Sequence, residues 1–226
     1  GQKIRNIDQP TEIIVLPEMF STGFSMQPEK WAETMEGPTV DWMRRLSIEK
    51  RAIITGSIII VENGNYYNRL IWMLPNGELG YYDKRHLFAF AGEDQHYTPG
   101  NKRLIARVKG WKINLQICYD LRFPIWSRNE LINGIPKYDL LIYVANWPSV
   151  RAEVWKTLLK ARAIENVAYV IGVNRIGEDG NGHAYSGDSA IVNFRGEHTT
   201  ELSLDELNAF REKFPALNDA DSFQLK

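Results

Sequence analysis

Short apolar runs separated by polar turns make up most of the first half of the chain. The runs are rich in Ile, Val, Leu and aromatic residues, and Gly, Asn or Pro interrupts them, which is typical of β-strands. The predicted strands of this half are 12–16, 52–61, 66–74, 79–84, 103–108 and 112–118. Residues 38–51 begin with a proline and space Val40, Met43 and Leu46 at helical intervals, which predicts a helix between the first two strands.

The second half repeats this order loosely after an irregular, polar stretch at 85–103. We expect strands at 139–145, 168–175 and 189–194, and helices near 125–133, 154–166 and 203–213. In the middle helix Val154, Leu158, Ala161 and Ile164 would share one apolar face. Twice, then, the chain runs strand, loop, helix and strand. Two sheets packed face to face with helices outside would use that order.

Residues 1–226 read as a single domain, because no linker, low-complexity segment or short repeat divides them. The first core strand begins at residue 12 without an earlier element to pair with it, and the stretch around 198–200 leaves no room for a strand between a turn and a helix. We therefore expect the intact protein to contain additional segments at both places and to be heavier than 26.0 kDa.

Composition narrows the class of protein. Lys and Arg number 27 against 28 Asp and Glu, so the chain lacks the basic surface of a nucleic-acid binder. No apolar run approaches the ~20 residues that cross a bilayer, and the start does not resemble a signal peptide. The single cysteine permits no internal disulfide, which suits a reducing compartment. We expect a cytoplasmic protein with no nucleic-acid or membrane partner.

Three chemically capable side chains lie where predicted strands end. Glu18 follows "IIVLP", Lys84 ends "LGYYDK", and Cys118 ends "KINLQIC". Ligands usually gather at such strand ends and the loops after them. Taken singly, each residue also has an ordinary interpretation, as a solvated loop acid, a surface charge and a packed core thiol.

Cys118 could thus be an inert core residue, a metal ligand or a nucleophile. Metal binding is the weakest of these, because no two histidines have the close spacing of a zinc site. The histidines stand at His86, His96, His183 and His198. The local cysteine signature of papain-type proteases is absent as well. Composition and spacing leave the choice between packing and catalysis open.

The segments around these three residues resemble the Glu-Lys-Cys motifs of the nitrilase superfamily, the carbon–nitrogen hydrolases. The matching blocks are "LPEMF", "YYDKRHLF" and "CYDLRFP", and the later stretches "YVANWP" and "ARAIENVAYVIGVNRIGEDG" fit as well. Order and flanking residues agree across most of residues 12–226. Within the superfamily, the sequences of these segments are most similar to those of the bacterial omega-amidases.

This resemblance implies a four-layer α-β-β-α sandwich of the nitrilase type, an α/β fold with two mixed sheets and helices outside. Members of the superfamily usually pair their sandwiches, so a homodimer or a higher homo-oligomer is expected. They also begin with a strand and a long helix before the "IIVLPE" segment and carry more residues after "RGE". The resemblance therefore strengthens the expectation that segments are missing before residue 12 and around residues 198–200.

The resemblance also implies a mechanism. Glu18 would act as general base, Cys118 would attack the substrate carbonyl, and Lys84 with the backbone N–H of Tyr119 would stabilise the oxyanion. The resulting thioester would be hydrolysed by water that Glu18 activates, with no metal or organic cofactor. A second glutamate of the superfamily corresponds to Glu93, with Asp94 as the near competitor.

The implied substrates are short omega-monoamides of dicarboxylic acids, such as 2-oxoglutaramate, 2-oxosuccinamate and succinamate. Their carboxylate calls for a cation, for which Arg122 is the first candidate and Arg175 and His183 are alternatives. Arg122 could equally be a structural partner of Asp120.

Aromatic residues would form the walls of the substrate site. The candidates are Phe24, Tyr119 and Trp147.

Two other functions stay open. One is a different carbon–nitrogen hydrolase that acts on a nitrile, a carbamoyl amine or an aliphatic amide. The other is a non-catalytic member that binds a metabolite or partner, although such a protein would not need all three motif residues.

Overall fold

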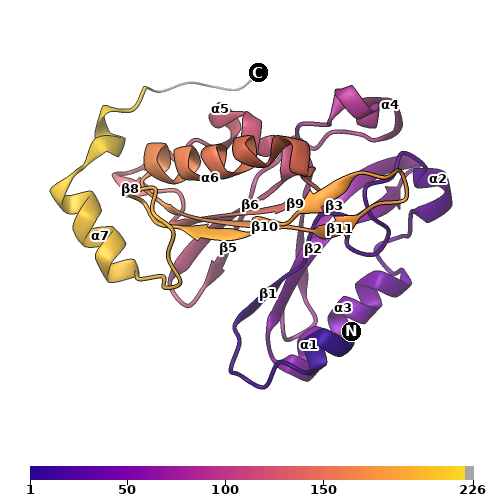
Figure 1. Ribbon diagram of the computed structural model, residues 1–226. Coiled ribbons are helices and arrows are strands. Elements are labelled where there is room, and N and C mark those ends of the chain that lie inside the picture. The colour runs from indigo at the N-terminus through magenta and orange to yellow at the C-terminus, as the bar shows by residue number, and fades with distance from the viewer. Residues whose placement is uncertain (222–226) are drawn as a thin grey trace.

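Two β-sheets pack face to face and carry helices on their outer surfaces, as Figure 1 shows for the computed structural model. The structure describes residues 1–221. Sheet A has the order β1-β2-β3-β4, with β1 at Ile13–Val15, β2 at Ile53–Glu62, β3 at Asn65–Met73 and β4 at Leu79–Asp83. Sheet B has the order β13-β10-β9-β6-β5, with β5 at Leu104–Val108, β6 at Trp111–Ile117, β9 at Leu140–Ala145, β10 at Tyr169–Asn174 and β13 at Ala190–Val192.

Both sheets are mixed. In sheet A, β1 pairs with β2 in parallel, whereas β2, β3 and β4 are antiparallel. In sheet B, β6, β9 and β10 are parallel, and β5 and β13 run antiparallel at the two edges. The predicted fold of two mixed sheets is confirmed.

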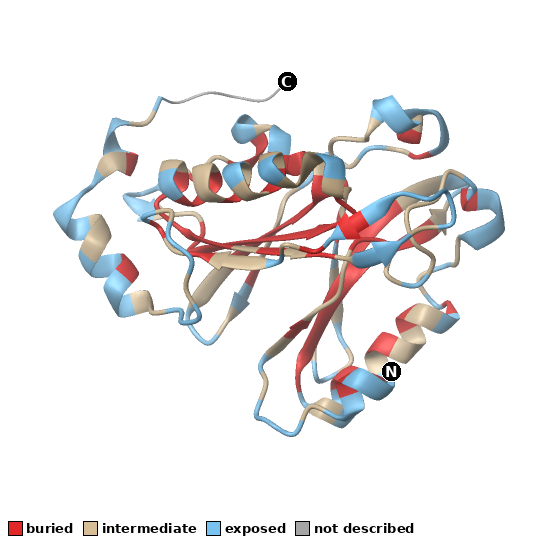
Figure 2. Cartoon of the chain, viewed as in Figure 1, coloured by how far each residue is buried: buried red, intermediate tan, exposed pale blue. Residues whose placement is uncertain are grey.

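The outer layers are helical. Against sheet A lie α1 (Gln2–Arg5) and α3 (Pro38–Lys50), and against sheet B lies α6 (Ala152–Asn166). The remaining helices are α2 (Pro28–Trp31), α4 (Glu93–His96), α5 (Pro124–Ser127) and α7 (Leu204–Lys213), with 3₁₀ turns η1 (Ala89–Ala91), η2 (Cys118–Arg122), η3 (Ser149–Arg151) and η4 (Ala216–Asp219). Figure 2 shows the consequence, a band of buried strands between partly exposed helices. The α-β-β-α order of layers agrees with the prediction.

Alternating side chains of β3 hold these layers together. Leu70 and Trp72 join the apolar cluster between the two sheets, while Ile71 and Met73 join the cluster under α3. Successive strand residues point to opposite faces, so one strand contributes to two interfaces. Each fully buried side chain of this kind contributes roughly 1.5–3 kcal/mol.

The buried face of α6 is rotated by one residue from the predicted one. Trp155, Leu159 and Ala163 are buried, whereas Ile164 is 53% exposed. The reason is Gly172 on β10: a Cβ built there would come within 2.6–2.8 Å of Leu159 and Trp155, so these two side chains occupy the space above a residue that has no side chain. Sheet packing, rather than the apolar period of the helix alone, sets its rotation.

The predicted helix near 125–133 is wrong beyond its first turn. α5 ends at Ser127, and the chain then forms a hairpin of β7 (Leu131–Ile132) and β8 (Ile135–Pro136). Asn133 and Gly134 both have positive φ, and Asn-Gly is the sequence that two-residue hairpin turns favour. A second unpredicted hairpin joins β11 (Ile176–Glu178) to β12 (Ala184–Ser186).

A membrane-spanning helix is not among the elements of residues 1–221, since none of their helices is both long and apolar enough.

Replacement of Gly172 by Ala should destabilise the protein, because the added methyl group meets Leu159 and Trp155 well inside van der Waals distance. Overpacking of a filled core typically costs about 1–3 kcal/mol in the free energy of unfolding. Urea unfolding followed by tryptophan fluorescence measures it. Gly180→Ala is the matched control, because nothing lies within 4 Å of its Cβ position. Equal stability of the two variants would show that α6 can shift away from β10 freely.

Candidate active site

The three predicted motif residues meet in space although each follows a different strand. Glu18 lies just after β1, Lys84 directly follows β4, and Cys118 directly follows β6 as the first residue of η2. Their exposed fractions are 1%, 1% and 9%, respectively. Side chains from both sheets therefore converge at one buried point.

The Lys84 ammonium group lies between two carboxylates. Its Nζ donates to Glu18 Oε1 at 2.9 Å and to Glu93 Oε2 and Oε1 at 2.8 and 3.1 Å. Glu93, at the start of α4, is completely buried, whereas its neighbour Asp94 is exposed. Of the two acids that the sequence offered in this loop, Glu93 is the one that contacts Lys84.

Neutral donors complete the shell around these carboxylates. Asn68 Nδ2 on β3 donates to Glu18 Oε1 at 2.8 Å and to Glu93 Oε1 at 3.2 Å. The backbone N–H of Asn146, just after β9, donates to Glu18 Oε2 at 2.9 Å, and that of Phe88 donates to Glu93 Oε2 at 2.6 Å. Buried charges are tolerated when they are paired and hydrogen-bonded in this way.

Sequence reasoning missed Asn68 and Asn146. A signal for Asn68 was present, since it is a polar residue inside the otherwise apolar run of β3. Asn146 stands in "VANWP", directly after an apolar strand. Neither pattern indicates that the side chain or backbone reaches a glutamate from the first strand.

Burial and charge set the protonation states of the cluster. Burial alone would lower the pKa of Lys84, but the charges of Glu18 and Glu93 outweigh it and raise the pKa above its usual value, so the amine stays an ammonium ion. Burial raises the pKa of Glu93, which Lys84 opposes and the Glu18 charge reinforces.

The surroundings of Cys118 favour the neutral form of its thiol. Burial raises its pKa well above the ordinary value, and the nearby charge of Glu18 raises it further, while Lys84 opposes both. A thiol is a poor nucleophile compared with its thiolate. A base that removes the proton would make the thiol more reactive, and the carboxylate whose charge acts on Cys118 most strongly is that of Glu18.

The backbone of Cys118 is in the left-handed region, with φ +44°. For a residue with a side chain this conformation costs of order 1–3 kcal/mol and persists where the surroundings enforce it. Asp120 enforces it here: its Oδ2 accepts from the N–H of Ile117 at 3.0 Å and from the Tyr82 hydroxyl at 2.7 Å. Its Oδ1 accepts from the N–H of His86 at 2.9 Å. The turn that carries the thiol is thus fixed to the loop after Lys84.

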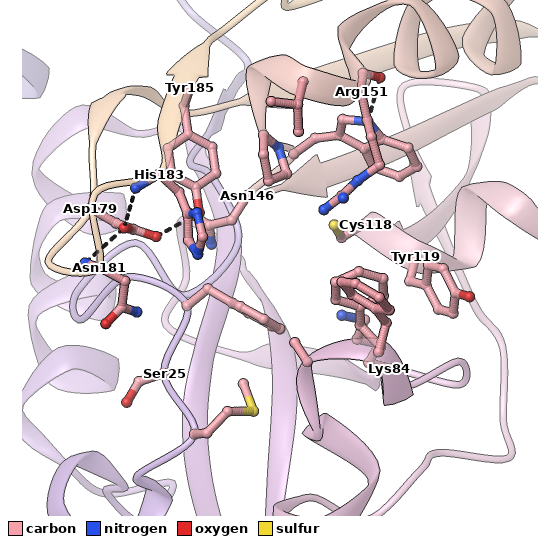
Figure 3. A pocket seen from close by; sticks show the side chains of 18 of the residues that line it. Ser25, Lys84, Cys118, Tyr119, Asn146, Arg151, Asp179, Asn181, His183 and Tyr185 are labelled. Atoms are coloured by element: carbon pink, nitrogen blue, oxygen red, sulfur yellow. Dashed lines mark hydrogen bonds between the residues drawn. The ribbon is translucent and has the colours of Figure 1, made fainter.

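A cavity of about 690 Å³ opens onto Lys84 and Cys118 (Figure 3). The predicted wall and binding residues Phe24, Tyr119, Arg122 and Trp147 all line it. Among the alternatives, His183 lines the same cavity, whereas Arg175 lines a neighbouring one. The structure therefore brings together, at one site, every residue that the sequence analysis names as a first candidate.

Arg122 does not pair with Asp120, which was the structural alternative. Asp120 contacts His86 instead, with Nδ1 and Oδ1 2.8 Å apart. The Arg122 side chain is exposed and lies over the Trp147 ring, with 5.3 Å between the guanidinium carbon and the ring centroid. It is therefore free to bind a ligand in the cavity.

The far wall of the cavity is the β11–β12 hairpin, which sequence reasoning left as a loop. Asp179 Oδ1 accepts from the N–H groups of Asn181 and His183, and Oδ2 accepts from the Tyr185 hydroxyl at 2.9 Å (Figure 3). These bonds occupy Asp179 within its own hairpin. Across residues 1–221 no group of three or more His, Cys, Asp or Glu side chains is arranged to hold a metal ion.

Comparisons with known proteins agree with this arrangement. Residues 3–209 match the family model described as carbon-nitrogen hydrolase. The chain is 47% identical to the omega-amidase YafV of Yersinia enterocolitica over 96% of its own length and 87% of that protein. It is 28% identical to a 2-oxoglutaramate amidase of Bacillus subtilis over 92% of its length and 84% of that protein.

A solved structure gives the same result for the fold. XC1258 from Xanthomonas campestris, a CN-hydrolase superfamily protein with an arsenic adduct in its active site, superposes with a TM-score of 0.96 at 45% identity. The match covers 100% of this chain and 91% of that one. The chain therefore belongs to the carbon–nitrogen hydrolase family, and it is an enzyme that hydrolyses carbon–nitrogen bonds other than peptide bonds.

Proposed function

We propose that the protein is an amidase that hydrolyses the terminal amide of short omega-monoamides, and that Cys118 carries the acyl group as a thioester. The observation that carries the proposal is the cluster at the inner end of the cavity. The buried Lys84 ammonium lies 2.9 Å from Glu18 Oε1, Lys84 and Cys118 both line the cavity, and the charge of Glu18 is near enough to raise the pKa of the Cys118 thiol. Amide hydrolysis needs a nucleophile, a base and a charge that stabilises an oxyanion.

In the first half of the reaction Glu18 takes the thiol proton as Cys118 Sγ attacks the amide carbon. The carbonyl oxygen becomes an oxyanion, which the Lys84 ammonium and the N–H of Tyr119 stabilise. Collapse of this intermediate breaks the carbon–nitrogen bond. Glu18 returns the proton to the leaving nitrogen, so ammonia departs and a thioester on Cys118 remains.

In the second half water replaces ammonia. Glu18 removes a proton from the water as its oxygen attacks the thioester carbon, and Lys84 again stabilises the oxyanion. The carbon–sulfur bond breaks, the proton passes from Glu18 to the sulfur, and the acid is released. Glu93 stays ion-paired with Lys84 throughout and holds the ammonium group in position.

The omega-monoamide class is supported from two directions. The relatives named above are an omega-amidase and a 2-oxoglutaramate amidase. The cavity is also lined by the cationic side chains of Arg122 and Arg151, which suit a substrate that carries a carboxylate as well as an amide. Small omega-monoamides also suit a cavity of this size.

The direct test is ammonia release from a panel of compounds at equal concentration. We expect turnover of 2-oxoglutaramate, 2-oxosuccinamate and succinamate and much slower turnover of nitriles and carbamoyl amines of equal length. Faster hydrolysis of a nitrile or a carbamoyl amine would assign the site to another activity of the family. Absence of ammonia from every compound would contradict the amidase proposal.

Alkylation of Cys118 should abolish activity, because it is the proposed nucleophile and the only cysteine of the chain. Treatment with iodoacetamide should give one adduct by mass spectrometry and a parallel loss of ammonia release, and succinamate should slow both. Cys118→Ala, which removes little volume, should keep the circular dichroism spectrum of the wild type, turn over no substrate and take up no label. Full labelling with activity retained would exclude a nucleophilic role.

Lys84→Met should reduce kcat by about 10²–10³, the usual effect of losing one oxyanion donor. It should also lower the free energy of unfolding by about 3–5 kcal/mol, since it leaves two buried carboxylates without their cation. A variant with more than about a tenth of wild-type activity would contradict the role of Lys84 in the reaction.

The stability loss of Lys84→Met should depend on pH. Burial and the charge of Glu18 already raise the pKa of Glu93, and the variant lacks the Lys84 charge that opposes them. A carboxyl group with a raised pKa in the folded state binds its proton more tightly than in the unfolded chain, so it favours folding below its unfolded pKa of about 4.3. That contribution disappears as pH rises through the folded value. Urea unfolding should therefore show a smaller deficit near pH 4 than at pH 7.

A further inference from the structure

Two arginines line the cavity without any carboxylate partner. Arg122 comes from η2 and Arg151 from η3. In the part of the chain that the structure describes, no Asp or Glu oxygen lies within 4.0 Å of either guanidinium group. Arginines in a folded protein usually satisfy their donors with acids or carbonyls. Two that do not, at one cavity, indicate a site for an anion.

Aromatic rings hold both side chains in place. The guanidinium carbon of Arg122 lies 5.3 Å from the centroid of the Trp147 ring, and that of Arg151 lies 5.5 Å from the Phe88 ring. Trp147 is buried, and its Nε1 donates to the backbone carbonyl of Arg151 at 2.9 Å, so it supports both arginines. In Figure 3 the Arg151 side chain reaches from η3 into the cavity on the side of Cys118. Stacking on a ring leaves the N–H edge of a guanidinium free for a planar anion.

The cluster of Lys84, Glu18 and Glu93, in contrast to the two arginines, does not favour an anion. The Lys84 ammonium is already paired with the carboxylates of Glu18 and Glu93, so this end of the cavity carries no free positive charge. A substrate carboxylate would be repelled there and attracted to the unpaired guanidinium groups. The cavity thus has an electrostatic direction, which favours a neutral amide at the thiol and an anion at the arginines.

The third arginine near the site is engaged elsewhere. Arg175 lines the neighbouring cavity, and its Nη2 donates to the backbone carbonyl of Glu178 at 3.0 Å. His183 also lines the substrate cavity, but it belongs to the β11–β12 hairpin and lies across the cavity from Cys118 in Figure 3. Neither has the combination of free donors, ring support and a place beside the nucleophile turn that Arg122 and Arg151 share.

We propose that Arg122 and Arg151 together form the subsite for the carboxylate of the substrate, with Arg151 as a specificity-determining residue that acts as strongly as Arg122. The inference rests on the proposed amidase function. The subsite selects a monoamide whose far end is a carboxylate and orients it with the amide at Cys118.

The test compares succinamate with its neutral methyl ester in Arg151→Gln and Arg122→Gln. Loss of one charge-assisted contact should raise KM for succinamate roughly 10–100-fold in each variant, with little change in kcat. KM for the ester should change less than about twofold, since the subsite makes no charged contact with it. Arg195→Gln is the matched control: this arginine also stacks on an aromatic ring, Phe194, at 4.8 Å, but it does not line the cavity.

Several outcomes would overturn the inference while leaving the amidase function intact. An equal loss of kcat/KM for acid and ester in Arg151→Gln would make Arg151 a support for Trp147 rather than a ligand for the carboxylate. An unchanged KM in Arg151→Gln, or a selective loss in Arg175→Gln, would place the carboxylate elsewhere.

A binding measurement separates this inference from the proposed function. Calorimetric titration of succinamate into Cys118→Ala requires no turnover, and the addition of Arg151→Gln to that background should weaken binding by the same roughly 10–100-fold. If the wild type releases no ammonia but the binding difference appears, the subsite stands and the amidase proposal fails. If ammonia is released and the binding difference is absent, the subsite is wrong.

Discussion

A buried lysine ammonium held between two buried carboxylates constrains the whole active site. Lys84 follows β4, Glu18 follows β1 and Glu93 begins α4, so the ion pairs connect three separate parts of the chain. Charges removed from water cost several kcal/mol each unless their partners are fixed at short distances. The loops that carry these residues therefore cannot move independently without exposing or unpairing a charge.

The same network joins the two sheets. Glu18 belongs to sheet A, and its carboxylate and backbone carbonyl both accept hydrogen bonds from Asn146 at the end of sheet B, at 2.9 and 2.7 Å. Asp120 makes the corresponding connection in the other direction, from the turn after β6 to Tyr82 on β4. Cys118 at a strand end of one sheet is thus placed beside Glu18 and Lys84 at strand ends of the other by polar contacts that leave the apolar interface between the sheets undisturbed.

Sequence patterns predicted the parts of this site that depend on strand ends. Glu18, Lys84 and Cys118 each directly follow an apolar run, and the resemblance of their flanking residues to one superfamily tied them together. Asn146 and Arg151 could not be found in this way, because their positions depend on how sheet B and η3 face sheet A. The predicted buried face of α6 is wrong for the same reason, because the missing side chain at Gly172 of β10, rather than the helix itself, decides which residues pack against the sheet. The β7–β8 hairpin is different: its Asn-Gly turn is visible in the sequence, but the apolar residues before it also fit a helix.

The charges that line the cavity affect how strongly the enzyme can discriminate between amides with and without a carboxylate. A pocket that merely fits an alkyl chain separates related substrates by about 1–3 kcal/mol, whereas unpaired polar groups in the site penalise a substrate that cannot satisfy them much more heavily. Arg122 is exposed and Arg151 is partly buried, so solvent can reach both guanidinium groups. A neutral ligand at the proposed subsite leaves both guanidinium groups to solvent, whereas a carboxylate gives them a charged acceptor. Because solvent can still reach both groups, the proposed subsite would select an omega-carboxylate mainly by attracting it, and it would penalise a neutral substrate only weakly.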